Sequence, residues 1–328
     1  MPELVNAADS HLTQILSESF PLWGDGLTLR AYADWNRAQS RTSYGRLNLE
    51  RVAWIEKDTL LASAKRYRLQ LWVHGRVVDT LGIGAVFTPP ARRGHGHASA
   101  LIEAMCRQAA TRGCELALLF SEIGPRYYER LGFRVVPLTS AEIVVKTPGG
   151  APAMLVRAGE EKDAAAVAAT HVQRVQRYRF GVMPDAELVA YSVTKKRLMA
   201  GFDSSGRRSV EYFVVEEGYQ AVAYALIQVT RAARPGEPDS WSLAACGDRD
   251  PGGARLGALL QVLLARAPGA QAPRIRSWWP TDLRPPQLDI RSRGQAAEIM
   301  MLRPLTPAAA PTPPLESHDV LYWHGDAF

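Results

Sequence analysis

The turn at residues 92–99 contains the residues best suited to binding an anion. Two arginines precede Gly94-His95-Gly96, and a helical apolar pattern begins at residue 97. Backbone N–H groups at the start of a helix have no intrahelical acceptor, and the helix dipole adds partial positive charge there. Glycines let the main chain approach a ligand closely. The segment therefore predicts a site where main-chain groups hold a pyrophosphate.

Two other phosphate-binding motifs fit this turn poorly. The dinucleotide fingerprint needs a third Gly or Ala where this chain has Ser99. The phosphate-loop pattern needs a Gly-Lys-Ser/Thr ending, which is missing here. His95 and His97 could suggest a metal pair, but no third ligand stands near them in the sequence. We expect no metal.

The elements that flank the turn are predicted by their apolar patterns. A strand over residues 82–87 runs into Pro89-Pro90, and an amphipathic helix covers residues 97–112. Residues 52–56, 60–73 and 77–87 read as an antiparallel meander, with turns at Lys57-Asp58 and His74-Gly75. Helices are also predicted over 9–20 and 29–38, a short one over 124–131, and strands over 116–120, 133–137 and 143–146.

Two segments together resemble the GNAT superfamily of N-acetyltransferases. Arg93-Gly94-His95-Gly96-His97-Ala98 is similar to its acyl-CoA motif, Arg/Gln-x-x-Gly-x-Gly/Ala. Tyr127-Tyr128-Glu129-Arg130-Leu131-Gly132-Phe133 is similar to its "Phe-Tyr-Glu-Lys-Leu-Gly-Phe" signature. The resemblance implies an α/β (α+β) GNAT fold, a mixed and mostly antiparallel sheet flanked by helices, with acetyl-CoA as co-substrate.

The resemblance also implies roles for individual residues. Tyr128 falls on the family tyrosine that protonates the CoA sulfur, and a positioned acid contributes a factor of about 10²–10⁴ in rate. The strand end near Val86 and Phe87 receives the pantetheine arm and polarises the thioester carbonyl. The predicted cofactor-binding residues are Val86, Phe87, Thr88, Arg92, Arg93, Gly94, His95, Gly96, His97, Ala98 and Ser99.

The general base is open at this stage. An aliphatic amine of pKa about 10.4 is only about 0.04% neutral at pH 7, so a group must accept its proton. Glu122, near the end of the 116–120 strand, is the first candidate. The C-terminal segment offers His324, Asp326 and the carboxylate of Phe328. In tandem-GNAT acetyltransferases of the enhanced-intracellular-survival type, a C-terminal carboxylate has this role.

The acceptor is predicted only by class. Phe87-Thr88-Pro89-Pro90 and Phe120–Pro125 are similar to the fungal lysine N6-acetyltransferase group, as is, loosely, Tyr322-Trp323. We therefore expect a small-molecule primary amine or a lysine-like amino acid as acceptor. The alternative is a non-catalytic protein that senses acyl-CoA or serves in interactions.

The second half of the chain repeats the order strand, turn, helix. Its turn, Asp248–Gly253, is acidic and lacks the acyl-CoA motif, so it should repel a pyrophosphate. We predict a catalytic GNAT domain at 1–147, a degenerate GNAT-like domain at 148–305 that covers the substrate site, and a Pro-rich spacer with a docking tail at 306–328. An unrelated α+β domain is the alternative for the second half.

Composition limits the other classes of function. The net charge of +6 is spread along the chain, without the basic stripe that nucleic-acid binding needs. No signal region or membrane-length apolar run is present, so we expect a cytoplasmic protein with no membrane partner. The three cysteines suggest neither a disulfide framework nor a metal site. The oligomeric state is open.

Overall fold

The structure of the protein is a computed structural model that describes residues 1–146, 154–234, 236–267, 271–296 and 298–326. The chain divides into two compact units, each built from two separate stretches of sequence. The first unit comprises Met1–Val136 and Glu298–Pro313. The second comprises residues 137–297 and 314–327.

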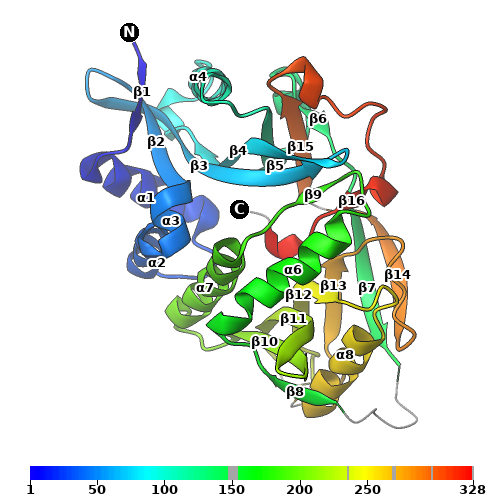
Figure 1. Cartoon of the computed structure of the whole chain (residues 1–328). Coiled ribbons are helices and arrows are strands. Elements are labelled where there is room, and N and C mark those ends of the chain that lie inside the picture. The colour runs from blue at the N-terminus through cyan, green and yellow to red at the C-terminus, as the bar shows by residue number, and fades with distance from the viewer. Residues whose placement is uncertain (147–153, 235, 268–270, 297, 327–328) are drawn as a thin grey trace. The chain divides into compact units, whose positions relative to one another are not determined.

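The first unit is built on one twisted sheet (Figure 1). The strand order is β1-β2-β3-β4-β5-β15-β6, and β4 and β5 are parallel while the other neighbours are antiparallel. The strands are β1 Glu3–Asn6, β2 Leu49–Glu56, β3 Thr59–Val73, β4 Arg76–Phe87, β5 Leu116–Ser121, β6 Arg134–Val135 and β15 Ile299–Pro304.

Helices cover both faces of this sheet (Figure 1). On one face, α4 buries Leu101, Ile102 and Met105 against apolar residues of β2 to β5. On the other face, α2 meets polar side chains of β2 and β3. The helices are α1 Asp9–Trp23, α2 Leu29–Arg41, α3 Ser43–Asn48, α4 His97–Thr111 and α5 Arg126–Glu129.

The meander and its turns are confirmed. Strands β2, β3 and β4 pair in antiparallel order, and both connections have left-handed backbone. Lys57 and Asp58 have φ of 47° and 63°, while His74 and Gly75 have φ of 48° and 89°. Positive φ at two successive residues is the geometry of the tightest hairpin turns, whose twist matches that of the strands.

The second unit has a seven-stranded sheet in the order β14-β7-β13-β12-β11-β10-β8. Its strands are β7 Thr139–Val145, β8 Leu155–Ala158, β10 Arg208–Glu217, β11 Gln220–Thr230, β12 Ser240–Asp248, β13 Arg274–Trp278 and β14 Leu288–Gln295. Its helices are α6 Ala164–Val175, α7 Ala186–Phe202 and α8 Ala254–Arg266. Two short strands, β9 Phe180–Val182 and β16 Val320–Leu321, pair in parallel.

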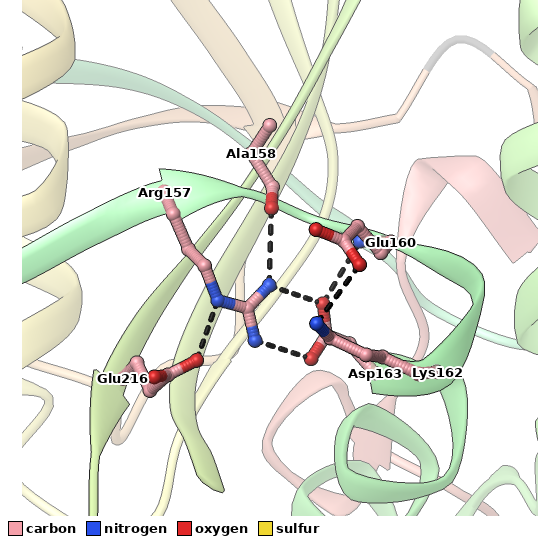
Figure 2. Close-up of polar contacts among 6 residues, drawn as sticks. All are labelled: Arg157, Ala158, Glu160, Lys162, Asp163 and Glu216. Carbon is pink, nitrogen blue, oxygen red and sulfur yellow. Dashed lines mark hydrogen bonds and ion pairs between the residues drawn. The ribbon is translucent and has the colours of Figure 1, made fainter. Parts of the chain in front are cut away.

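A cluster of charges joins β8, β10 and the start of α6 (Figure 2). The Arg157 guanidinium donates two 2.7 Å hydrogen bonds to the Asp163 carboxylate and one of 2.5 Å to Glu216. Asp163 also accepts the N–H of Glu160 at 2.8 Å, as one half of a capping box. The hydrogen bonds from Arg157 hold the pKa of Asp163 below its usual value. These contacts cap the start of the helical segment that leads into α6.

Two strands belong to the other sheet than the predicted domains require, so this assignment from sequence is wrong. The strand predicted over residues 143–146 lies in the predicted first domain, but β7 pairs with β13 and β14 in the second unit. β15 lies in the predicted second domain, 148–305, but it pairs with β5 and β6 in the first unit. Met300, Met301 and Leu302 are 0–3% exposed, as suits a strand buried on both faces. Local pattern predicts a strand but not its partner.

The C-terminal segment is packed within the second unit. Val320, Leu321, Tyr322 and Trp323 are all at most 4% exposed, which confirms that this apolar stretch docks. The spacer before it includes a short 3-10 helix at Pro307–Ala309. The functional division into a catalytic and a covering domain stays a prediction, as do its limits at residues 147 and 305.

Candidate active site

The end of β4 bends away from a regular ladder. Lys65 of β3 lies opposite Gly84, whereas Ser63 lies opposite Phe87, so β4 has one extra residue between these pairs. Ala85 at this bulge has φ of 46°, a left-handed value that is strained for a residue with a Cβ. On the other side, pairing of β4 with β5 stops at Ile83–Leu119. The main chain of residues 84–87 therefore lies outside the β4–β5 ladder.

Helix α4 starts directly after a left-handed glycine. Gly94 and Gly96 have φ of 81° and 77°. None of the described side chains caps this helix, and its first intrahelical bond runs from the Ala100 N–H to the Gly96 carbonyl at 3.0 Å. The N–H groups of residues 96–99 therefore have no acceptor within the helix. This is the backbone arrangement that an anion site at a helix start requires, and anion binding here stays a prediction.

Space remains in front of these N–H groups. A Cβ built on Gly94 or Gly96 meets no described atom within 4 Å. Arg92, Arg93 and His95 are exposed at the same turn, and the Arg93 Nε donates to the Thr88 carbonyl at 3.2 Å. The residues thus fit a diphosphate group: main-chain donors, flanking positive charge and room for an anion to approach.

Tyr128 lies in the apolar core of the first unit, at the end of α5. It is 7% exposed and meets the rings of Tyr127 at 4.9 Å and Phe133 at 6.1 Å, both edge-on. Burial is the main reason that the pKa of Tyr128 is raised to about 12, and nearby Tyr127 and Glu122 add to it. The phenol therefore keeps its proton at neutral pH and can act as an acid.

Tyr127, on the same helix α5 as Tyr128, contacts the predicted cofactor turn. Its hydroxyl shares a 2.9 Å hydrogen bond with Ser99 Oγ in the first turn of α4. The structure therefore brings the two sequence motifs together, because Tyr127 and Tyr128 are adjacent on α5. The sequence does not predict this link. A hydroxyl pair 28 residues apart leaves no signal in local spacing.

The remaining predicted residues have distinct surroundings. Glu122 is exposed in the loop after β5, where the Ser121 Oγ donates to the Gly124 carbonyl at 2.7 Å. Phe87 is 2% exposed and meets the Trp23 ring at 6.3 Å, and Val86 packs against the core under α4. Phe328 lies outside the described residues, so the proposed base remains a prediction.

The equivalent turn of the second unit is closed. Gly253, with φ of 74°, precedes α8, but a Cβ there would lie 2.9 Å from Leu283 and 3.0 Å from Pro285. The Asp248 carboxylate accepts the N–H groups of Asp250 at 2.8 Å and Leu256 at 3.0 Å. A side chain of the protein thus takes the position that a bound anion would need.

The structure also bears on metal sites and on membrane-spanning helices. His95 and His97 stack at 5.9 Å, and the described residues contain no group of three or more His, Cys, Asp or Glu side chains that could hold a metal. Among the described helices, none combines the length and apolar character needed to cross a membrane. The sequence also does not predict the polar contacts between α2 and the sheet, Arg51 to Asn36 and Lys65 to Gln39.

Comparison with known proteins gives one family match. Residues 23–136 match the acetyltransferase (GNAT) domain family. No curated protein matches the chain. This matched region contains the bulged end of β4, the start of α4, and Tyr128. Residues 23–136 therefore form a GNAT acetyltransferase domain, and the enzyme class is N-acyltransferase.

Several solved structures share the fold along most of the chain. A GCN5-related N-acetyltransferase from Kribbella flavida is 16% identical with a TM-score of 0.67, covering 93% of this chain and 71% of that one. Eis1 from Mycobacterium abscessus is 14% identical with a TM-score of 0.59, covering 93% and 74%. A tandem GNAT protein from the clavulanic acid biosynthesis pathway is 11% identical with a TM-score of 0.51, covering 94% and 99%.

These likenesses confirm the predicted fold class. They include a tandem GNAT protein that matches almost end to end, which supports the prediction that the second half is also GNAT-like. At sequence identities of 11–16%, these likenesses are evidence for the fold and not for the activity. The finer resemblance to the fungal lysine N6-acetyltransferase group is not tested by them and stays a prediction.

Proposed function

We propose that this protein transfers an acetyl group from acetyl-CoA to a primary amine of a small, lysine-like molecule. One observation carries the proposal. An uncapped helix start with two left-handed glycines, open to solvent, stands beside the bulged end of β4 within a GNAT domain. The N–H groups of residues 94–99 would hold the pyrophosphate, and Arg92 and Arg93 would add charge complementarity.

The end of β4 would orient the reacting group. Residues 84–87 lie outside the β4–β5 ladder, so their main-chain groups are available to a pantetheine arm and to the thioester carbonyl. Acetyl-CoA supplies an activated acyl group when bound. Held in this place, the acyl carbon and the amine would already be in the geometry for reaction. They would then lose little further translational and rotational entropy at the transition state, and this accounts for a large part of enzymatic rate enhancement.

Proton transfer completes the reaction. As the amine nitrogen bonds to the acyl carbon and the C–S bond breaks, the Tyr128 hydroxyl would give its proton to the sulfur. Its raised pKa ensures that the proton is present at neutral pH. The ammonium would lose one proton before attack, to Glu122 or to the C-terminal carboxylate of Phe328, directly or through water. The second nitrogen proton, released as the amide forms, would restore the Tyr128 hydroxyl.

The proposal is tested by the acetylation of an amine panel that includes lysine. Wild type should consume acetyl-CoA with at least one amine, and Tyr128→Phe should lower kcat by about 10²- to 10⁴-fold while the Kd for CoA stays unchanged. Tyr219→Phe is the matched control, because Tyr219 is 97% exposed in the second unit. Tight CoA binding without turnover of any amine would instead indicate an acyl-CoA sensor.

A further inference from the structure

A cavity lies between helices α6 and α7 and the sheet of the second unit. The two helices pack against each other and on β10, β11 and β12 (Figure 1). About 400 Å³ of space is left unfilled there, part of it open to solvent. The described residues that line it all belong to this unit. Its apolar wall consists of Val167, Pro184, Leu188, Val189, Val193, Leu226 and Ala245.

Two of the polar side chains in the lining already have partners within the protein. Ser192 Oγ accepts a hydrogen bond from the Lys196 ammonium at 2.8 Å. Asp326 accepts the Trp323 N–H at 3.3 Å, and the nearby Lys196 favours its charged form against the effect of burial. Because an ion is costly to bury and this carboxylate has a cation near it, a neutral ligand suits the cavity better than a charged one.

Two other side chains of the lining have polar atoms without partners. His171 and Tyr212 are each 5% exposed. Neither His171 Nε2 nor the Tyr212 hydroxyl has a hydrogen-bond partner within the described part of the chain. Tyr212 also lines a neighbouring cavity, with Glu160 and Arg197, whereas His171 lines this one. A buried polar atom that lacks a partner costs stability, so His171 Nε2 indicates that a ligand or a water molecule supplies one.

The unpartnered nitrogen of His171 is a hydrogen-bond acceptor. Burial lowers the pKa of His171 to about 4, so the imidazole is neutral at pH 7. The ring also has a hydrogen bond to the Val182 backbone, which acts against this shift of the pKa. A contact that favours the protonated ring is one in which a ring N–H donates to a carbonyl oxygen. Since a neutral imidazole has a single N–H, Nε2 is left as the acceptor and requires a donor from the ligand.

We propose that this cavity binds a small, neutral molecule with an apolar body and an O–H or N–H group that donates to His171 Nε2. Phenols, indoles and short alcohols have this chemistry. A concave and mostly apolar lining with a polar anchor is typical of small-molecule sites, where the anchor fixes the orientation of the ligand. The residues of this cavity are different from those of the acyl-transfer site proposed in the first unit, so the site does not depend on that proposal.

The first experiment compares phenol with toluene, which has nearly the same shape but no hydrogen-bond donor. Wild type should bind phenol, and isothermal titration gives the Kd of each compound. His171→Leu should lower the preference, expressed as the Kd of toluene divided by the Kd of phenol, by about 2- to 12-fold, the range expected for one net hydrogen bond. His171→Gln should keep more of this preference, because its amide has an acceptor oxygen. His318→Gln, at a side chain 63% exposed in the same unit, is the control and should change neither Kd.

The second experiment needs no substitution, so it also covers the case in which His171→Leu does not fold. Nitrogen-15 NMR observes the imidazole nitrogens, and an unprotonated nitrogen changes its chemical shift when it accepts a hydrogen bond. Phenol should therefore shift the Nε2 resonance of His171 in wild type. Toluene, which would occupy the same space without a donor, should leave this resonance nearly unchanged.

Each outcome either supports or overturns the site. A preference for phenol that falls in His171→Leu, or a phenol-specific shift of Nε2, supports it. Failure of phenol to bind to wild type would overturn it and would leave water as the partner of His171. Binding of phenol with an unchanged preference in His171→Leu and no shift of Nε2 would overturn it as well. None of these results depends on turnover of an amine, so they stand apart from the test of acetyl transfer.

Discussion

Helices α4 and α8 both begin immediately after a left-handed glycine that follows a strand (Figure 1). Before α4, the chain contains Arg92, Arg93 and two glycines with open space around them. Before α8, the Asp248 carboxylate accepts two main-chain N–H groups, and Leu283 and Pro285 lie against Gly253. The same local backbone thus leaves an open helix start in one unit and a closed turn in the other.

The difference shows what makes a helix start a binding site. N–H groups without acceptors attract an anion whatever its source. In the second unit the anion is the Asp248 carboxylate of the chain itself, so its hydrogen bonds to the turn contribute to stability. In the first unit no described side chain takes that place, and the donors remain for a ligand. Three predictions test this comparison, and a fourth tests the proposed acid, Tyr128.

Replacement of Asp248 by Ala should have the largest effect. It leaves the N–H groups of Asp250 and Leu256 without their acceptor in a buried turn, which should cost about 2–4 kcal/mol in the free energy of unfolding. Urea denaturation measures this loss. Asp250→Ala is the control in the same turn, because Asp250 accepts only the Gly252 N–H, on an exposed side. Equal losses for the two variants would contradict the comparison.

A carboxylate placed at the open turn should make the first unit resemble the second. Gly94→Asp should weaken CoA binding by about 10- to 100-fold, because a negative charge would face the pyrophosphate at short range. Isothermal titration with CoA measures Kd. Gly94→Asn is the matched control: it has the same shape and tolerates positive φ, but it carries no charge. A similar Kd for the Asp and Asn variants would argue against an anion site here.

Loss of one flanking charge should have a small effect. Arg93→Gln removes an exposed cation beside the turn and should raise the Kd for CoA by about two- to fivefold, the range of exposed ion pairs. The effect should diminish as salt is added, since exposed charges are screened. Arg41→Gln at the exposed end of α2 is the control. A loss that persists at high salt would indicate a buried contact instead.

The smallest expected effect concerns pH. Burial raises the pKa of Tyr128 to about 12, so the neutral, proton-donating form is retained above the ordinary tyrosine pKa of about 10. For a saturating amine, kcat should therefore not fall as pH passes about 10. A decline with an apparent pKa near 10 would show that the acid is a solvated group rather than Tyr128.

Much of the candidate site could be predicted from sequence because its parts are local. The glycines, the arginines and the helix that follows are contiguous, and helix-start chemistry depends on neighbours in the chain. The same holds for the hairpin turns at Lys57-Asp58 and His74-Gly75, which are confirmed by their backbone angles. The roles of the site residues stay predictions.

Contacts between distant segments could not be predicted. The hydrogen bond of Ser99 to Tyr127, the pairing of Arg51 with Lys65, and the exchange of β7 and β15 between sheets all join residues that have no common local pattern. A strand's apolar residues indicate that it will be buried, but many sheets can bury it. Its partner is chosen by the packing of the whole unit.

The sequence by itself determined which chemical groups are available: a glycine turn proposed to bind an anion, a tyrosine proposed as the acid, and a second turn that carries acidic residues. Only the tertiary structure decided which of these groups stand together and which are closed off. The physical reason is the distance along the chain over which each effect acts. Backbone conformation and helix dipoles act over a few neighbouring residues. Burial, ion pairing and access to a ligand depend on segments that meet only after folding.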